Sequence, residues 1–357
     1  MTVFLVLIVI ILFAVAILQM SKIYKLSKGS ATVEDGEVAT GKDNRINAKL
    51  FLMFMVFLYF LMIYCFWHYS KFYLPEASSA HGGKYDTLMF VSIGLIMVVQ
   101  VITQFLLHYF AYKYKGEKGK KALFYADNDK LEFIWTIIPV IVLAGLIIYG
   151  LFTWSDIMNF DENEDAMVVE LYAQRFNWRA RYSGDDNILG NANVRFVDGP
   201  NVVGIDASDD DGQDDIVTQE LHLPVGRQVI FKLRSQDVLH SAYMPHFRAQ
   251  MNVVPGMITQ FSFTPTVTTE EIRETDYMQE KMRRIQKIRK EKSKELVAAG
   301  DVALDDYDEF DYYLLCNKIC GASHYNMQMK IVVETEEEFN EWLATQQTFG
   351  DSMKAEQ

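Results

Sequence analysis

The chain has 357 residues, of which 50% are hydrophobic and 13% aromatic, and its formal net charge is −13 at pH 7. This length and apolar content can supply both a membrane anchor and one sizeable folded domain. The negative charge and the lack of a glycine-rich phosphate loop argue against nucleic-acid and nucleotide binding. No Cys-x-x-Cys-His motif occurs, so we expect no covalently attached c-type haem.

The hydrophobic residues concentrate in four stretches, near 3–20, 50–67, 88–110 and 134–154. Each stretch is about long enough to cross ~30 Å of hydrocarbon as a helix. We therefore predict a membrane anchor over residues 1–154 with about four transmembrane helices. The alternative for the first stretch is a signal peptide, but the absence of a basic region before it and of small residues after it favours retention.

Lysine and arginine are distributed unevenly among the loops. Segments 21–49 and 112–130 each hold six, whereas 70–86 holds only Lys71 and Lys84. The positive-inside rule places the two rich loops in the cytoplasm, so the N-terminus and everything after residue 154 are expected outside. In that oxidising compartment, a retained pair of thiols needs a metal or a disulfide. Cys65 lies within a predicted span and is interpreted as a small apolar residue.

The composition changes after Trp154, where an acidic run at 161–165 leads into segments that alternate between apolar and polar residues. Period-two alternation and intervening turn residues predict strands of a sandwich or barrel, followed by an amphipathic helix over 337–347 and a tail over 351–357. The predicted strands lie near 166–173, 216–223, 228–234, 257–264 and 328–334.

Two insertions interrupt this pattern. The first, 183–215, is rich in aspartate at spacings that fit no EF-hand, so it is interpreted as a solvated acidic loop rather than a calcium site. The second, 266–306, opens with a helix cap at Thr268 and predicts a charged helix. That helix either presents a solvent-exposed face or docks a partner within a larger assembly.

The segment from Cys316 to Met327 concentrates two thiols, an imidazole and a thioether in twelve residues. Soft sulfur ligands with imidazole suit copper, and zinc is the main rival. A structural zinc site usually places its ligands in two short pairs, of which one is visible here. A disulfide between Cys316 and Cys320 would close a small, strained ring. The Cys, His, Met order is typical of a copper electron-transfer loop, while zinc and a disulfide stay open as alternatives.

A further ligand must come from earlier in the chain. His240 follows the strand-like run Val229 to Arg234 and is the best candidate among seven histidines. His246 is its serious competitor.

Three motifs together resemble subunit II of the haem-copper cytochrome c oxidases: Asp237-Val238-Leu239-His240-Ser241, Val254-Pro255-Gly256 and the segment from Cys316 to Met327. The resemblance implies an all-β Greek-key barrel of the cupredoxin type over 155–350, interrupted by the two insertions. It also implies that this barrel holds a dinuclear copper centre, CuA.

Carried over residue by residue, the resemblance implies a complete set of copper ligands. These are the bridging thiolates of Cys316 and Cys320, the imidazoles of His240 and His324, the thioether of Met327 and the backbone carbonyl of Lys318. The family commonly has Glu where this chain has Lys318, and that Glu often serves a magnesium site. A magnesium ligand from this chain is therefore in doubt.

Three other positions carry possible roles from the family. The segment from Glu132 to Pro139 is similar to the family's entry into its second helix, which implies a proton-path entrance at Glu132; the alternative is an ordinary helix-start carboxylate. Phe176 takes the place of the family's first electron-entry Trp, although a role in the core competes with that assignment, and Trp178 is interpreted as packing. Asp237 matches a position implicated in cytochrome c docking.

The implied function is the electron-input subunit of a respiratory terminal oxidase. Electrons would pass from cytochrome c, or a cytochrome c domain, through CuA to haem in subunit I, where O2 is reduced to water with proton pumping. The implied partners are subunit I with its haem and CuB, subunit III, and a supercomplex with an upstream respiratory complex. The implied location is the bacterial inner (plasma) membrane, with the copper domain on the periplasmic side and the acidic loop helping to steer cytochrome c.

Two alternative functions stay open, of which the second belongs to another class of protein. A related quinol-oxidase subunit would share the anchor and barrel but lack the copper ligands. A non-redox membrane-anchored barrel would bind zinc or copper without electron transfer.

Overall fold

The computed structural model describes residues 2–28, 40–117, 119–121, 123–159, 165–305, 307 and 309–355. The chain divides into two compact units, one formed by Met1–Phe66 with Gln100–Ala126 and the other by Trp67–Val99 with Asp127–Gln357. Among the described residues, the regular elements of the first unit are helices. The second contains the remaining parts of two helices, a fourth helix and the whole β domain.

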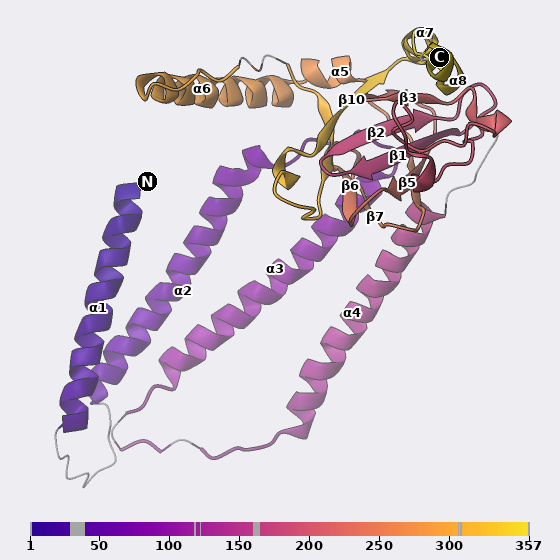
Figure 1. Ribbon diagram of the computed structural model, residues 1–357. Helices are drawn as coiled ribbons and strands as arrows, with labels where there is room; N and C mark the ends of the chain where they lie inside the picture. The colour runs from indigo at the N-terminus through magenta and orange to yellow at the C-terminus, as the bar shows by residue number, and fades with distance from the viewer. Residues whose placement is uncertain are drawn as a thin grey trace. The chain divides into compact units, whose positions relative to one another are not determined.

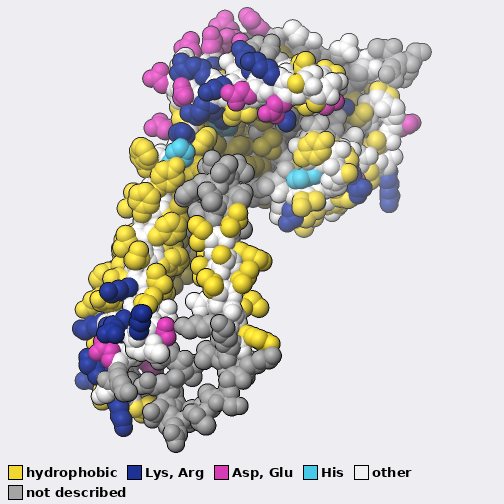
Figure 2. Space-filling view, turned by 90° about the vertical axis from the view of Figure 1, so that its left-hand side faces the viewer, with side chains coloured by type: hydrophobic (Ala, Val, Ile, Leu, Met, Phe, Trp, Pro, Cys, Tyr) yellow, Lys and Arg dark blue, Asp and Glu magenta, His cyan; other side chains and the backbone are white. Residues whose placement is uncertain are grey.

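Four long helices precede the β domain: α1 (Thr2–Lys28), α2 (Gly41–Tyr69), α3 (Gly82–Lys113) and α4 (Asp129–Met158) (Figure 1). Each contains one of the four predicted apolar stretches. Three spans among the described residues, Gly41–Phe72, Gly82–Lys113 and Asp129–Met158, are long and apolar enough to cross a membrane. Hydrophobic side chains cover much of the visible helical surface, as expected where lipid surrounds it (Figure 2). A crossing by α1 stays a prediction.

Helices α2 and α3 pack together within the first unit. The Tyr59 hydroxyl donates a hydrogen bond to the carbonyl oxygen of Val101 at 2.6 Å, and the Phe51 ring stacks on His108 with centroids 4.1 Å apart. Aromatic packing therefore holds the pair together where both helices are apolar.

Ten strands form two five-stranded sheets in the second unit, with orders β3-β2-β1-β5-β8 and β4-β10-β9-β6-β7. Apolar side chains from both sheets, among them Leu171, Phe231 and Tyr312, are buried in one core. This two-sheet domain behind an apolar helical anchor confirms the predicted fold class. The strands are β1 (Met167–Gln174), β2 (Asn177–Tyr182), β3 (Ile216–Thr218), β4 (Leu221–Pro224), β5 (Val229–Ser235), β6 (His240–Met244), β7 (Ala249–Val253), β8 (Thr259–Phe263), β9 (Tyr312–Cys316) and β10 (Gln328–Glu334).

The C-terminal end differs from the sequence-based expectation. The amphipathic helix predicted over 337–347 is α7 (Glu336–Ala344), and a further helix, α8 (Phe349–Ala355), occupies most of the predicted tail. Phe349 is buried against Tyr172 and Ile205, and its backbone N–H donates to the Asp215 carbonyl at 2.7 Å. Burial of Phe349 thus attaches to the domain a segment that its polar composition had led us to predict as a tail.

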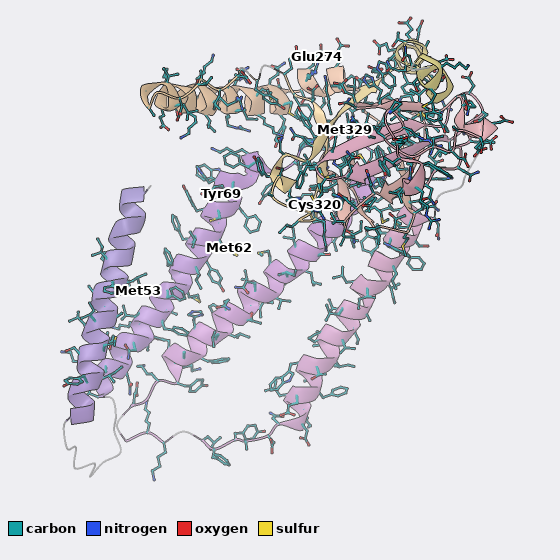
Figure 3. The ribbon with its side chains drawn as sticks, viewed as in Figure 1. Met53, Met62, Tyr69, Glu274, Cys320 and Met329 are labelled. Atoms are coloured by element: carbon teal, nitrogen blue, oxygen red, sulfur yellow. The ribbon has the colours of Figure 1, made fainter. Side chains whose placement is uncertain are left out.

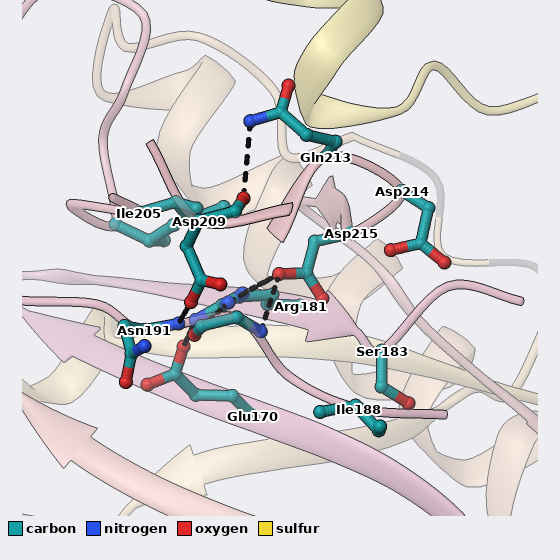
Figure 4. A network of polar contacts seen from close by, with 12 residues as sticks. Glu170, Arg181, Ser183, Ile188, Asn191, Ile205, Asp209, Gln213, Asp214 and Asp215 are labelled. Atoms are coloured by element: carbon teal, nitrogen blue, oxygen red, sulfur yellow. Dashed lines mark hydrogen bonds and ion pairs between the residues drawn. The ribbon is translucent and has the colours of Figure 1, made fainter. Parts of the chain in front are cut away.

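The acidic insertion 183–215 is folded onto the first sheet: Asp215 is buried, which the interpretation as a solvated loop did not include, while Asp210 and Asp211 are exposed as expected. Fully buried Arg181 on β2 donates to Asp215 Oδ2 through Nε at 2.9 Å and to Glu170 Oε2 on β1 at 3.2 Å (Figure 4). Arg234 on β5 also pairs with Glu170 and donates to the Val203 carbonyl. Two arginines therefore balance two buried carboxylates beneath the insertion.

The second insertion contains α5 (Thr269–Glu274) and α6 (Asp276–Ala298), which confirms the predicted charged helix. Thr268 Oγ1 accepts from the Glu271 N–H at 3.1 Å, and Glu271 Oε2 accepts from the Thr268 N–H at 2.8 Å. This reciprocal pair is a capping box and explains why α5 begins where the sequence indicated. Met278 and Met282 bury one side of α6 against the β-domain core.

The connection from α2 to α3 is built into the β domain. After the short helix η1 (Ser70–Phe72), Ser78 N–H donates to the His246 carbonyl at 2.8 Å, and Ser79 Oγ donates to the Phe247 carbonyl at 2.7 Å. Arg248 Nε and Asp86 Oδ1, near the start of α3, are 2.8 Å apart. These buried contacts attach the start of α3 to the sheets, so the helix and the domain form one unit here.

Candidate metal centre

Strand pairing brings two distant parts of the chain together at one end of the second sheet. His240 is the first residue of β6 and Cys316 is the last residue of β9, and these antiparallel strands pair Ala242 with Cys316. Alternate residues of a strand face the same side, so His240 and Ala242 share a side of β6. The register therefore places the imidazole beside the thiol although 76 positions separate them.

The loop between β9 and β10, in which Figure 3 labels Cys320, carries the remaining sulfur and nitrogen donors. Cys316 Sγ lies 3.8 Å from His240 Nδ1 and 3.9 Å from Cys320 Sγ. Cys320 Sγ lies 3.6 Å from His324 Nδ1 and 3.7 Å from Met327 Sδ. The structure thus brings together all five predicted side-chain ligands.

The sixth predicted ligand, the backbone carbonyl of Lys318, also faces the cluster. Its oxygen lies 3.2 Å from Cys316 Sγ, while the residue as a whole is exposed. The donors divide into two similar groups. His240 Nδ1 and the Lys318 oxygen lie beside Cys316, and His324 Nδ1 and Met327 Sδ lie beside Cys320.

The two cysteines are free thiols, and their sulfurs are too far apart for a disulfide bond. Burial has the largest single effect and tends to raise the pKa of Cys316, but hydrogen bonds with His240, the backbone of Lys318 and Ser241, and His324 together lower the pKa to about 6. Burial and the nearby Cys316 charge raise the pKa of Cys320 to about 11. One thiolate forms readily, and a metal ion would be needed to displace the second proton near neutral pH.

Asp237 orients the first imidazole. Its Oδ1 lies 2.9 Å from His240 Nε2, and its Oδ2 accepts from the Arg175 N–H at 3.0 Å. A carboxylate only accepts, so Nε2 carries a proton, and loss of the other ring proton, from Nδ1, would leave a lone pair directed toward Cys316 for a metal. This partner was missed from the sequence, where Asp237 was assigned only to docking; an aspartate three residues before a ligand histidine was the available signal.

Phe176 packs against the ligand loop. A Cβ placed on Gly321 would lie 2.8 Å from Phe176 Cζ, closer than side-chain atoms pack. Gly321 also has φ +146°, a conformation that favours glycine. The buried Trp178 ring approaches the His240 ring edge-on with centroids 6.2 Å apart. Phe176 therefore touches the loop from outside, while Trp178 packs behind the first imidazole.

Other sequence candidates lie away from this cluster. His246 packs edge-on against Phe310 and Tyr312, at centroid distances of 5.0 and 5.5 Å, and does not belong to the group of His240, Cys316 and Cys320 that could hold a metal. Glu132 is exposed in the first turn of α4, at the opposite end of that helix from the β domain. The structure places it on a helix start and shows no further contact that defines a role.

The donor set fits copper. Two thiolates, two imidazoles, a thioether and a carbonyl combine the soft and intermediate ligands that copper prefers. The main donors are buried, and strand pairing and hydrogen bonds hold them in place. Such fixed ligands suit electron transfer, because little rearrangement accompanies a change of oxidation state. The anchor, the two-sheet domain and this donor cluster define a membrane-anchored protein with a candidate copper site.

Comparisons with known proteins give the family. The model of the transmembrane domain of cytochrome C oxidase subunit II matches residues 68–152. The alternative cytochrome c oxidase subunit 2 of Bradyrhizobium diazoefficiens is 32% identical over 243 residues, covering 68% of this chain and 72% of the relative. The chain therefore belongs to the cytochrome c oxidase subunit II family and is part of an oxidoreductase complex.

Two further matches are more distant. Cytochrome c oxidase subunit 2 of Thermostichus vulcanus is 24% identical over 298 residues, covering 75% of this chain and 77% of the relative. The crystal structure of the periplasmic domain of subunit II of cytochrome oxidase from Bradyrhizobium japonicum aligns with 16% identity, covering 50% of this chain and 91% of that one. Its TM-score of 0.29 is too low to add to the assignment.

Proposed function

We propose that this chain is the electron-input subunit of a respiratory terminal oxidase and that it holds a dinuclear copper centre. The observation that carries the proposal is the division of the donors into two groups around a shared pair of sulfurs 3.9 Å apart. A single zinc ion needs four ligands, whereas this chain supplies two thiolates that can bridge and two further donors beside each. A copper pair bound there would supply reversible one-electron chemistry.

The protein's own residues would hold the centre rigid and insulated from water. Asp237 fixes the His240 ring, and Cys316 N–H donates to the Met327 carbonyl at 3.0 Å, which ties the ends of the loop together. Burial of His240, Cys316 and Cys320 lowers the local dielectric constant. These features would tune the reduction potential and limit reorganisation.

Electrons would enter from cytochrome c, or a cytochrome c domain, and leave toward haem in subunit I, where O2 is reduced to water and protons are pumped. Phe176, packed on Gly321, is the proposed entry contact, and exposed Ile319 and Tyr325 on the ligand loop offer apolar surface for a partner. The folded acidic insertion would attract a basic donor. Glu132 is the proposed entrance of the proton path.

The three spans support anchoring in a membrane, and we propose the bacterial inner membrane with the copper domain on the periplasmic side. Partners would include subunit I with its haem and CuB, subunit III, and an upstream respiratory complex in a supercomplex. A magnesium ligand is not proposed at Lys318, because an ammonium group cannot replace a carboxylate.

The test is metal analysis and electron paramagnetic resonance on the full-length chain purified in detergent. We expect two coppers per chain and one unpaired electron shared between them. Cys316→Ser should abolish that signal, and Cys65→Ser, which changes a thiol in α2, should leave it intact. One isolated Cu(II), or stoichiometric zinc without a redox signal, would overturn the proposal and favour the non-redox barrel. Absence of bound metal would favour the quinol-oxidase type.

A further inference from the structure

Helix α6 is a basic element in an acidic protein. Between Asp276 and Ala298 it carries eight lysines and arginines against four acidic residues, whereas the whole chain has net charge −13. One side is occupied, because Met278 and Met282 are buried in the core and Ile285 packs against it. Tyr277, Lys281 and Arg284 are half-buried, and most residues from Lys287 to Ala298 are exposed.

Four cations form a stripe on that exposed surface: Arg283, Lys287, Lys290 and Lys294. Their spacing of four, three and four residues places them on one helical face. All four residues are exposed. Arg283 pairs with Glu280 on the same helix at 3.1 Å, while the three lysines have no acidic partner among the residues that the structure describes. We call these four residues the cationic stripe.

A neighbouring face of α6 contacts the end of a membrane span. The Tyr277 hydroxyl donates to the Tyr73 carbonyl, and Arg284 donates to the Lys71 carbonyl at 3.2 Å. The Arg284 guanidinium also lies 5.6 Å from the centre of the Phe72 ring. The apolar span that begins at Gly41 ends at Phe72, so α6 contacts the chain where it leaves the membrane.

The residues at this boundary are of the type that lies between hydrocarbon and water. Trp67, Tyr69 and Phe72 are 75%, 42% and 58% exposed at the end of the span (Figure 3 labels Tyr69). Exposed aromatic rings at a span terminus mark the level of the lipid headgroups. Ile288 follows Arg284 by four residues, shares its face and is 65% exposed. An exposed apolar side chain on this face is more stable at the membrane boundary than in bulk water.

We propose that α6 is an interfacial helix whose cationic stripe binds the headgroups of anionic phospholipids around the β-domain end of α2. Charge complementarity and attachment at headgroup level favour lipid over an acidic protein as the occupant. Binding would hold the helix along the membrane surface and restrain the copper domain to which its buried side is packed. The copper site plays no part in this inference.

The test is hydrogen exchange, measured by mass spectrometry, on the full-length chain in lipid nanodiscs. Discs of phosphatidylcholine alone are compared with discs that also contain phosphatidylglycerol. We expect amides of 283–297 to exchange at least about tenfold more slowly in the anionic discs, and high salt to remove the difference. Equal exchange in both discs would overturn the proposal.

A triple variant, Lys287→Gln/Lys290→Gln/Lys294→Gln, should lose the difference between the two discs. The matched control, Lys232→Gln/Lys330→Gln/Lys354→Gln, removes the same charge from the sheets and the C-terminal helix and should keep it. If the stripe variant retains the difference, or the control loses it, specific lipid binding by α6 is wrong. Protection that appears only with the other oxidase subunits, whatever the lipid, would identify a protein occupant and also overturn the proposal.

Discussion

The two ring nitrogens of His240 face different partners, with Nε2 2.9 Å from Asp237 Oδ1 and Nδ1 3.8 Å from Cys316 Sγ. The carboxylate fixes both the tautomer and the angle of the ring. Its other oxygen accepts from the Arg175 backbone, which precedes Phe176. Asp237 therefore acts as a positioning residue for the site, independently of any part in docking cytochrome c.

Replacing Asp237 by Asn should weaken copper binding by about 10- to 100-fold. The amide can present N–H to Nε2 and stabilise the tautomer that blocks Nδ1. The measurement is competition for copper with a chelator, on the full chain without cytochrome c. Asp301→Asn, at an exposed position after α6, is the control and should bind as the wild type does. Unchanged copper affinity in Asp237→Asn would leave only the docking role.

Adding a methyl group at Gly321 should loosen the ligand loop. The new Cβ would meet the Phe176 ring at 2.8 Å, and a φ of +146° is unfavourable for alanine. We expect Gly321→Ala to lose copper to a chelator at least about tenfold faster, from strain of about 1–3 kcal/mol.

A control at Gly300 separates the strain of a positive φ from the clash with Phe176. Gly300 also has positive φ, +87°, but a Cβ there meets no atom within 4 Å, so Gly300→Ala reports backbone strain away from the loop. The double variant Gly321→Ala/Phe176→Ala should recover part of the loss by removing the clash. Equal copper release from Gly321→Ala and the wild type would show that Phe176 does not constrain the loop.

The grouping of the candidate ligands could be predicted because most of them lie close together in the sequence. Cys316, Cys320, His324 and Met327 occupy one short segment, and His240 follows a recognisable strand. The contacts between Phe176 and Gly321 could not be predicted, since they depend on how β2 lies beside the β9–β10 loop. Strands β6 and β9 were also missed, although their register is what brings His240 to Cys316.

In the acidic insertion, by contrast, composition alone mispredicts the burial of one residue. Its many aspartates indicated solvent exposure, yet Asp215 is fully buried because Arg181, 34 positions away, pairs with it. Composition describes the average of a segment, and one long-range ion pair reverses the environment of a single member. A buried arginine on a strand gives no sequence signal that distinguishes it from an exposed one.

Removing the Arg181 charge should strongly destabilise the β domain. Arg181→Met would leave Asp215 and part of Glu170 buried without a counter-charge, at a cost of about 3–5 kcal/mol. The check is the denaturant midpoint of the full chain, followed by circular dichroism. Arg195→Met, on the exposed surface of the same insertion, should change little. Arg181→Met/Asp215→Leu should recover stability; no recovery would mean that arginine contributes mainly by packing.

Acidification should destabilise the β domain through His246. Burial, with Lys281 and Arg248 as further causes, lowers the pKa of His246 to about 3 from 6.5. Below pH 6.5 the imidazole is protonated in the unfolded chain but stays neutral in the folded chain. The free energy of unfolding therefore decreases as pH falls, by about 1.4 kcal/mol per pH unit. The neighbouring rings of Phe310 and Tyr312 supply no acidic partner.

His246→Phe should flatten this pH dependence of stability between about pH 5 and about pH 6.5, measured as unfolding midpoints. Parallel pH profiles for the variant and the wild type would assign the acid sensitivity to other groups.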